Sequence, residues 1–158
     1  MNEQPYLFAP SDLWIPIRDG NVTAISIFKR HYTARTTRKI EQFIGPGEKM
    51  ALVTVDALAL FAWRKFISDA GEVGVNCCVF RNEGTPVARS SELIAAAMVM
   101  AWQRWPLERL YTYVDPSKVK HKRDPGRCFI RAGFRKCGVT KSGKIVLESG
   151  PHYAWPRS

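Results

Sequence analysis

The stretch that decides the fold is residues 75–105, which reads VNCCVFRNEGTPVARSSELIAAAMVMAWQRW. Its first part, Val75 to Phe80, is mostly apolar and carries Val75, Val79 and Phe80, residue types that favour a strand. The strand stops at a polar group, residues 81–84. After a short loop, a helix is expected from Ser90 to Trp105, and Pro106 ends it because the residue before proline is pushed out of the α region.

The predicted helix begins with polar residues and continues as an apolar run. Ser90 or Ser91 can cap the free amides of its first turn, and Glu92 lies where the helix dipole favours an acid. Leu93 to Trp102 is apolar throughout, so the helix is expected to be buried on most sides, and it is too short to span a bilayer. A strand, a polar loop and a helix with free amides form either an ordinary core unit or a binding site for an anion or cofactor.

The remaining elements follow from apolar spacing, proline, glycine and turn residues. The chain of 158 residues fits one domain, with tails at 1–12 and 149–158. The predicted order is strand, one or more helices, three strands, helix, strand, helix and two strands. This order predicts an α/β fold whose mixed sheet has about six to seven strands, with helices on both faces. The further elements are an edge strand Leu13–Arg18 with Pro16, a helix Val22–Tyr32 capped by Asn21, strands Met50–Val55, Leu58–Phe66 and Leu110–Val114, a helix from the cap Asp124 and Pro125 to Ala132, and a hairpin of Phe134–Thr140 with Ile145–Glu148.

The formal net charge is +10, which favours a polyanionic partner, with nucleic acid ahead of an anionic membrane. Two basic runs, 29–39 and 118–127, are either solvated surface or contacts to the backbone of double-stranded DNA. The candidate nucleic-acid-binding residues are Arg30, Arg35, Arg38, Lys118, Lys120, Lys122, Arg123 and Arg127. The four cysteines form no C-x-x-C pair, so reduced thiols in a cytoplasmic protein are expected. No signal peptide and no metal-ligand spacing is recognised, so no metal ligand is predicted.

The order of elements is similar to that of the GCN5-related N-acetyltransferase (GNAT) fold. In that fold the fourth strand, a phosphate-binding loop and the third helix hold coenzyme A, and the fourth and fifth strands splay apart to form the acyl-transfer cleft. Shorter pieces resemble the Mom-type phage proteins that modify DNA. They are His31-Tyr32, the stretches 80–83 and 90–93, Tyr111-Thr112-Tyr113-Val114-Asp115-Pro116, and the stretches 125–129 and 132–135.

The Mom-type resemblance implies an enzyme that transfers an acyl-derived group to the exocyclic N6 amine of adenine in DNA, which protects phage DNA from host restriction. The resemblance to the acetyltransferases implies that Arg89, Ser90 and Ser91 hold the donor. The loop at Val87 to Glu92 carries serines where those enzymes have glycines, which makes close approach of a pyrophosphate harder. The expected donor is therefore acetyl-coenzyme A or another activated acyl donor.

Adenine's amine is a poor nucleophile, so the enzyme needs a proton acceptor, a cation for the donor and aromatic faces for a base taken out of the duplex. The candidate catalytic residues are Asp115, Arg81, Tyr32, His31 and Tyr113. Asp115 either accepts a proton, binds the adenine edge, or bonds local backbone in an Asp-Pro turn. Arg81 either holds a donor carbonyl or phosphate, or pairs with Asp115 or Glu83. Tyr113 shares a strand face with Tyr111 and either stacks on the base or packs in the core.

Two other functions remain open. The chain is alternatively an N-acetyltransferase that acts on a small amine or a protein, in which case coenzyme A binds and duplex DNA does not. It is otherwise a nucleic-acid-binding protein without catalysis, in which case substitutions of Arg81 and Asp115 leave DNA affinity and phenotype unchanged.

Overall fold

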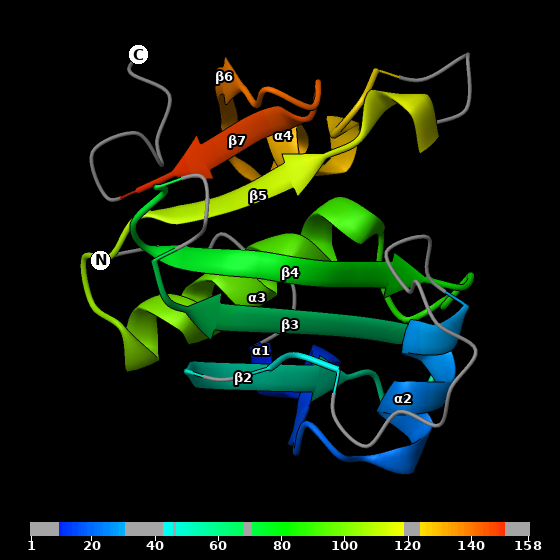
Figure 1. Cartoon of the computed structure of the whole chain (residues 1–158). Helices are drawn as coiled ribbons and strands as arrows, with labels where there is room; N and C mark the ends of the chain where they lie inside the picture. Colours follow the sequence, from blue (N-terminus) through cyan, green and yellow to red (C-terminus); the bar gives the residue numbers. More distant parts are fainter. Residues whose placement is uncertain (1–9, 31–42, 46, 68–70, 119–123, 151–158) are drawn as a thin grey trace, which may run out of the picture.

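The computed structural model describes residues 10–30, 43–45, 47–67, 71–118 and 124–150. These residues form an α/β fold with one mixed sheet of seven strands in the order β1-β2-β3-β4-β5-β7-β6 (Figure 1). The strands are β1 (Ile15–Ile17), β2 (Glu48–Val53), β3 (Ala59–Lys65), β4 (Val75–Asn82), β5 (Leu110–Val114), β6 (Arg135–Val139) and β7 (Ile145–Ser149). The helices are α1 (Pro10–Leu13), α2 (Val22–Lys29), α3 (Ser90–Arg104), the short 3₁₀ helix η1 (Pro116–Lys118) and α4 (Arg127–Ala132). The predicted order of the seven strands and of α2, α3 and α4 is confirmed, whereas α1 and η1 were not predicted.

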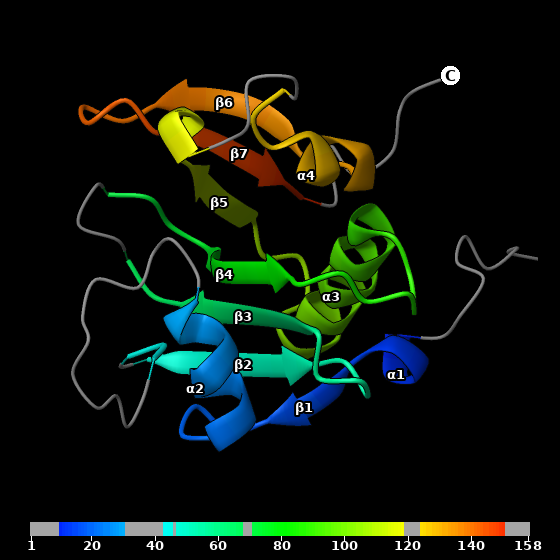
Figure 2. The same cartoon turned by 90° about the vertical axis from the view of Figure 1, so that its right-hand side faces the viewer.

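Helices cover both faces of the sheet, as predicted (Figure 2). On one face, α1, α3 and α4 enclose the larger core, which includes Trp14, Phe61, Trp63 and Phe129. On the other face, α2 packs Ala24 and Ile27 against β2, β3 and β4. We call these the α3 face and the α2 face.

Two tryptophans fix the buried helix α3 to the α3 face. The indole N–H of Trp14 donates to the Leu93 carbonyl at 2.8 Å, and that of Trp63 donates to the Ala97 carbonyl at 2.9 Å. Both rings are almost completely buried, and a buried indole needs such an acceptor. The apolar run in α3 is therefore core, as its composition predicts.

The sheet is antiparallel except between β4 and β5, which are parallel and separate early. Only Val75–Cys77 of β4 pairs with Leu110–Thr112 of β5. The Thr112 hydroxyl donates to the Cys77 carbonyl at 3.0 Å at the last paired position. A register shift between β3 and β4 falls at the same level, and beyond it β5 diverges from β4 toward the right of Figure 1.

The starts of two helices differ from the predictions. The N-cap of α3 is Arg89, so neither Ser90 nor Ser91 caps the helix, and the Glu92 carboxylate accepts a hydrogen bond from the Arg89 amide. The α4 helix begins at Arg127 after Gly126, two positions later than Pro125 predicts.

Close packing explains the late start of α4. Gly126 has φ +75°, and a Cβ there would lie 2.5 Å from Leu147 Cδ1 of β7. The turn before α4 lies so near the sheet that Asp124 and Pro125 stay outside the helix. At its other end, α4 stops at Gly133 in the left-handed conformation, as predicted.

The first elements also differ in detail from the predictions. Residues 10–12, expected in a tail, belong to α1, which packs on α3. The first strand is shorter than predicted but does lie on the edge of the sheet, where Pro16 costs no ladder hydrogen bond. Asn21 caps α2 by accepting from the Ala24 amide at 3.0 Å, as predicted, and α2 ends at Lys29. Within the described residues, no helix is long and apolar enough to cross a membrane.

Candidate functional site

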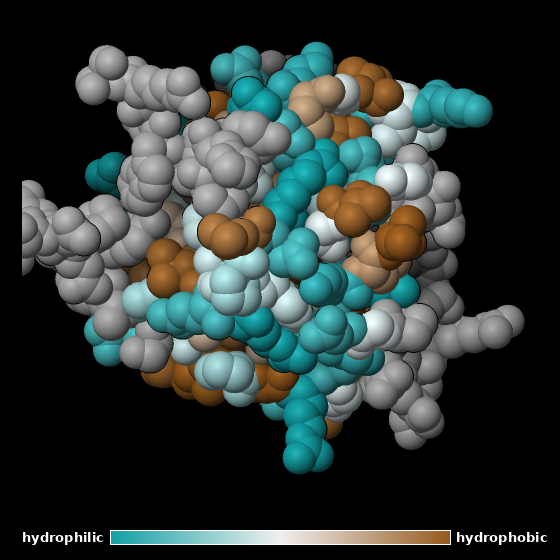
Figure 3. Space-filling model, turned by 90° about the vertical axis from the view of Figure 1, so that its left-hand side faces the viewer, coloured by the Kyte–Doolittle hydropathy of each residue, from teal (hydrophilic) through white to brown (hydrophobic). Residues whose placement is uncertain are grey.

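The candidate site surrounds the place where β4 and β5 separate. Both strands run in the same direction, so their carboxyl ends lie at one edge of the sheet, on the right of Figure 1. The β4 end leads to α3, and the β5 end leads to η1. Two groups of polar residues gather there, one on the α3 face and one at the strand ends. At the opposite end of these strands, Figure 3 shows small apolar groups separated by polar side chains.

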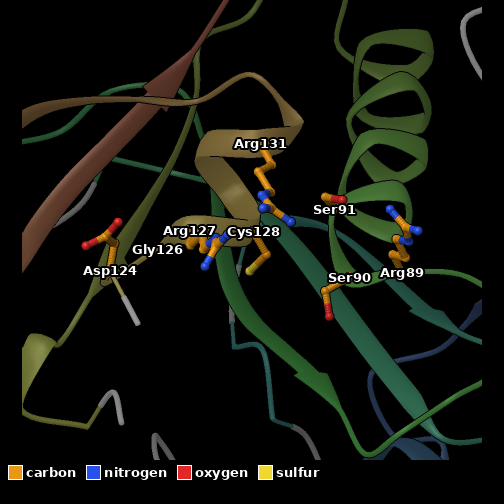
Figure 4. A pocket seen from close by; sticks show the side chains of 8 residues that line it. All are labelled: Arg89, Ser90, Ser91, Asp124, Gly126, Arg127, Cys128 and Arg131. Carbon is orange, nitrogen blue, oxygen red and sulfur yellow. The ribbon is translucent and has the colours of Figure 1, made fainter. Parts of the chain in front are cut away.

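On the α3 face, a pocket of about 630 Å³ lies between the start of α3 and α4 (Figure 4). The α3 side contributes Arg89, Ser90 and Ser91, the three residues predicted to bind the donor. The α4 side contributes Arg127, Cys128 and Arg131, with Asp124 and Gly126 from the preceding turn. The structure thus brings the three predicted donor-binding residues together with Arg127, which was predicted to contact DNA.

The pocket carries three guanidinium groups and one carboxylate. Arg127 and Arg131 are one helical turn apart, so they share one face of α4 and both line the pocket. Neither they nor Arg89 forms a salt bridge with another described residue. The backbone N–H groups in the first turn of α3 have no acceptor within the helix, and they lie at the end of α3 that borders the pocket. This combination of charge, hydroxyl groups and helix amides suits phosphate groups.

The loop between β4 and α3 is held by its own polar side chains. The Asn82 amide group donates to the Ser90 hydroxyl at 3.0 Å, and its oxygen accepts from the backbone amides of Gly84 and Thr85 at 2.9 and 3.0 Å. The buried Thr85 hydroxyl donates to Asp56 in the turn between β2 and β3. Asn82 therefore fixes the start of α3 relative to the β4 end without the glycines of the acetyltransferase loop.

Arg81, at the end of β4, pairs with Glu83 rather than with Asp115. Its Nε lies 3.2 Å from a Glu83 carboxylate oxygen, and Arg30 at the end of α2 binds both oxygens of the same carboxylate at 2.6 Å. The hydrogen bonds from Arg30 are the main reason that the pKa of Glu83 falls to about 2. The structure describes no bond from the two terminal nitrogens of Arg81 to another described residue. Among the described residues, Arg81 is thus held at one nitrogen, and its two terminal nitrogens are available to an anion.

Asp115 directly follows β5 and makes the local contacts expected of an Asp-Pro turn. One oxygen accepts from the Ser117 hydroxyl at 2.6 Å and from the Ser117 amide at 3.0 Å. The hydroxyl bond, followed by the amide bond, lowers the pKa of Asp115, and the charges of Lys118 and Lys144 add to the effect. A carboxylate with a lowered pKa accepts a hydrogen bond readily but is a weak proton acceptor near neutral pH.

Tyr111 and Tyr113 lie on the same face of β5, as predicted. Their rings meet edge to face with centroids 5.7 Å apart. Tyr111 is fully buried, whereas Tyr113 is half-buried and lies closer to the strand end. Tyr113 is therefore the better placed of the two to meet a ligand.

The residues predicted to contact DNA have different surroundings. Lys118 in η1 and Arg127 in α4 are exposed, whereas Arg30 is engaged by Glu83. The other predicted DNA contacts lie outside the described residues: Arg35, Arg38, Lys120, Lys122 and Arg123. The catalytic candidates His31 and Tyr32 also lie outside them.

Sequence reasoning missed Arg131, Cys128 and the anchoring role of Asn82. The spacing of Arg127 and Arg131 on a predicted helix was the available signal for a shared basic face. Nothing in the sequence indicated that this face turns toward α3. None of the four cysteines forms a disulfide in the structure. Among the described residues, no group of three or more His, Cys, Asp or Glu side chains is arranged to hold a metal ion.

Comparisons with known proteins do not assign the chain to a family. The sequence matches no protein-family model, and it matches no curated protein. The function is therefore argued from the geometry of the site.

Proposed function

We propose that the protein is an acetyltransferase-like enzyme that modifies DNA. In this proposal it transfers an acyl-derived group from an anionic donor to the exocyclic N6 amine of adenine. The modification would protect DNA from restriction. The proposal combines the resemblance to Mom-type phage proteins with the chemistry of the two polar groups beside the strand opening.

The observation that carries the proposal is the separation of β4 from β5. The two strands pair only at Val75–Cys77 and Leu110–Thr112, so main-chain groups beyond these positions have no partner in the adjoining strand. A basic pocket lies on the α3 face, and Arg81 and Asp115 lie at the ends of the two strands. An opening between a phosphate-binding pocket and a polar strand edge suits a donor on one side and an acceptor on the other. The order of strands and helices supports the same assignment to a GNAT-like fold.

The donor that fits the pocket carries several phosphate oxygens. Arg89, Arg127 and Arg131 can each donate paired hydrogen bonds to phosphate, and Ser90 and Ser91 can add hydroxyl donors. Acetyl-coenzyme A satisfies this requirement and supplies an activated acyl group when bound. Side chains that reach into the pocket replace the close backbone approach that glycines would allow. Another activated donor with comparable negative charge fits the same residues.

The acceptor side needs groups that orient adenine. The Asp115 carboxylate remains charged near neutral pH and can accept a hydrogen bond from the N6 amine. Tyr113 offers an aromatic face beside it, and the terminal nitrogens of Arg81 can bind a carbonyl or phosphate oxygen. Because Asp115 is a weak base, the proton acceptor in this scheme is one of the other candidates, His31 or Tyr32.

The direct test uses purified protein and acetyl-coenzyme A labelled in the acetyl group. Two duplexes of equal length are compared, one containing adenine and one built of G·C pairs alone. Label in the adenine duplex only, lost in the Arg81→Ala variant, is the expected result. Equal label in both duplexes would contradict an adenine target.

The alternative enzyme is an N-acetyltransferase that acts on a small amine or a protein. The paired state of Arg30 is the observation that favours it, because Glu83 neutralises one of the predicted DNA contacts. Coenzyme A binding without DNA binding would support this alternative against the DNA-modifying enzyme.

A further inference from the structure

The hairpin between β6 and β7, in which sequence reasoning assigned no DNA contact, places lysines beside the end of β5. β5 and β7 are antiparallel, and Val114 pairs with Ile145 at the end of their ladder. The next opposed positions are Asp115 and Lys144. A residue of the hairpin turn therefore lies across from the carboxylate at the β5 end.

The turn is well held and exposed. Its backbone is closed by bonds from the Thr140 amide to the Lys144 carbonyl at 2.8 Å and from the Gly143 amide to the Thr140 carbonyl at 2.9 Å. The Thr140 hydroxyl accepts from the Lys144 amide and contacts the Ser142 hydroxyl, both at 3.0 Å. Lys141 to Gly143 is exposed, so the turn presents donors to solvent from a fixed backbone.

The lysines of η1 and the hairpin are not neutralised by other described side chains. Lys118, Lys141 and Lys144 form no salt bridge with any other described residue. The charges of Lys118 and Lys144 both act on Asp115, which shows that these two lysines lie near its carboxylate. One cation from η1 and one from the hairpin thus lie near the carboxylate at the β5 end, and Lys141 adds an exposed charge in the same turn as Lys144.

We propose that the β6–β7 turn, with Lys141 and Lys144, forms a docking surface for the phosphate backbone of duplex DNA, next to Lys118. Phosphates bound there would hold the nucleotide beside Asp115 and Tyr113 at the strand opening. Backbone contacts position a protein on DNA without reading sequence, which suits lysines on a rigid turn. This inference rests on the proposed function and names the surface through which DNA reaches the site.

The experiment measures the affinity of a short fluorescent duplex by anisotropy over a range of salt concentrations. It compares the wild-type protein with the double variant Lys141→Gln/Lys144→Gln. Lys136→Gln is the matched control, because Lys136 is also exposed and unpaired among the described residues but lies near the other end of β6. Thermal unfolding of each variant confirms that the fold is unchanged.

Each phosphate contact contributes about −0.9 to the slope of log K against log salt. The double variant is expected to reduce the steepness of the slope by about 2, whereas Lys136→Gln leaves it unchanged. Salt-dependent DNA binding with the same slope in the double variant and the wild-type protein would overturn the docking surface and leave the proposed function standing. No DNA binding by the wild-type protein would overturn both the docking surface and the proposed function.

Discussion

Arg81 and Arg127 carry the same charge, but their surroundings give them different uses. Arg81 is half-buried, bound through Nε to Glu83, and therefore fixed in direction at the end of β4. Arg127 is exposed on α4, pairs with no described carboxylate, and shares its pocket with Arg89 and Arg131. The first suits the precise holding of one oxygen, and the second suits an anion with several oxygens.

Removing the α4 arginines tests the donor pocket. A hydrogen bond to a charged group contributes about 1.5–3 kcal/mol, and 1.4 kcal/mol corresponds to a tenfold change in affinity. Arg127→Gln and Arg131→Gln are each expected to weaken coenzyme A binding roughly tenfold or more in calorimetric titrations. Lys136→Gln removes one exposed charge elsewhere and should have no effect. Equal affinity in all variants would exclude the α4 arginines from donor binding.

Glu83 gives the protein a pH dependence with a definite sign. Its pKa falls from the ordinary 4.5 to about 2 in the folded state, because Arg30 and Arg81 stabilise the carboxylate. The resulting stability is complete above pH 4.5 and disappears as the pH falls toward 2. Glu83→Gln should therefore lower the melting temperature at pH 7, and the difference in melting temperature between the variant and the wild-type protein should shrink below pH 4.5. A difference that persists at pH 2 would show that the ion pairs are not its source.

Single residues were predicted best where the local sequence fixes their surroundings. The resemblance to the acetyltransferase loop assigned the adjacent residues Arg89, Ser90 and Ser91 to one site, and they line the same pocket. Glu83 as a partner of Arg81 was one of the options that proximity in sequence offered. The contact between Glu83 and Arg30 joins residues 53 positions apart, and no local pattern contains that information.

At the scale of the elements, Gly74 sets the start of the parallel pair β4–β5. It has φ +133°, and a Cβ there would overlap the backbone carbonyl of Arg109, which accepts a hydrogen bond from the Val75 amide. Position 74, just before β4, therefore requires both a positive φ and the absence of a Cβ.

Gly74→Ala should consequently destabilise the protein more than an ordinary glycine substitution. A positive φ costs an L-residue about 1–2 kcal/mol, and overpacking adds about 1–3 kcal/mol, so a loss of about 3 kcal/mol in denaturant unfolding is expected. Gly71→Ala is the control, because Gly71 has φ +83° with open space around it and should lose only about 1 kcal/mol. Equal losses would mean that the contact with Arg109 is unimportant.

The elements could be predicted from the sequence where the spacing of apolar residues and the turn residues indicate the same boundaries. The strand–loop–helix unit of β4 and α3, the β6–β7 hairpin and the cap of α2 by Asn21 all followed from such agreement. The starts of α3 and α4 did not. Serine favours a cap, but Asn82 binds the Ser90 hydroxyl from outside the helix, and Gly126 must fit against Leu147. Both causes are tertiary contacts.

At the scale of the whole molecule, the sheet separates two chemical environments. The basic pocket between α3 and α4 opens on one face, while Tyr113 lies on the face opposite the larger core. The strand opening lies between them. The net charge of +10 made a polyanionic partner predictable, but only the folded chain places Lys118 and Lys144 around Asp115.

The proposed modification of adenine in DNA is tested most directly by the mass of deoxyadenosine in cells that produce the protein. Host and plasmid DNA would be digested to nucleosides and analysed by mass spectrometry, with Arg81→Ala and Lys136→Gln produced at equal levels. We expect a heavier deoxyadenosine with the wild-type protein and with Lys136→Gln, and a loss of that species with Arg81→Ala. The added mass would identify the transferred group. Unmodified deoxyadenosine in cells that contain abundant, soluble wild-type protein would contradict adenine modification.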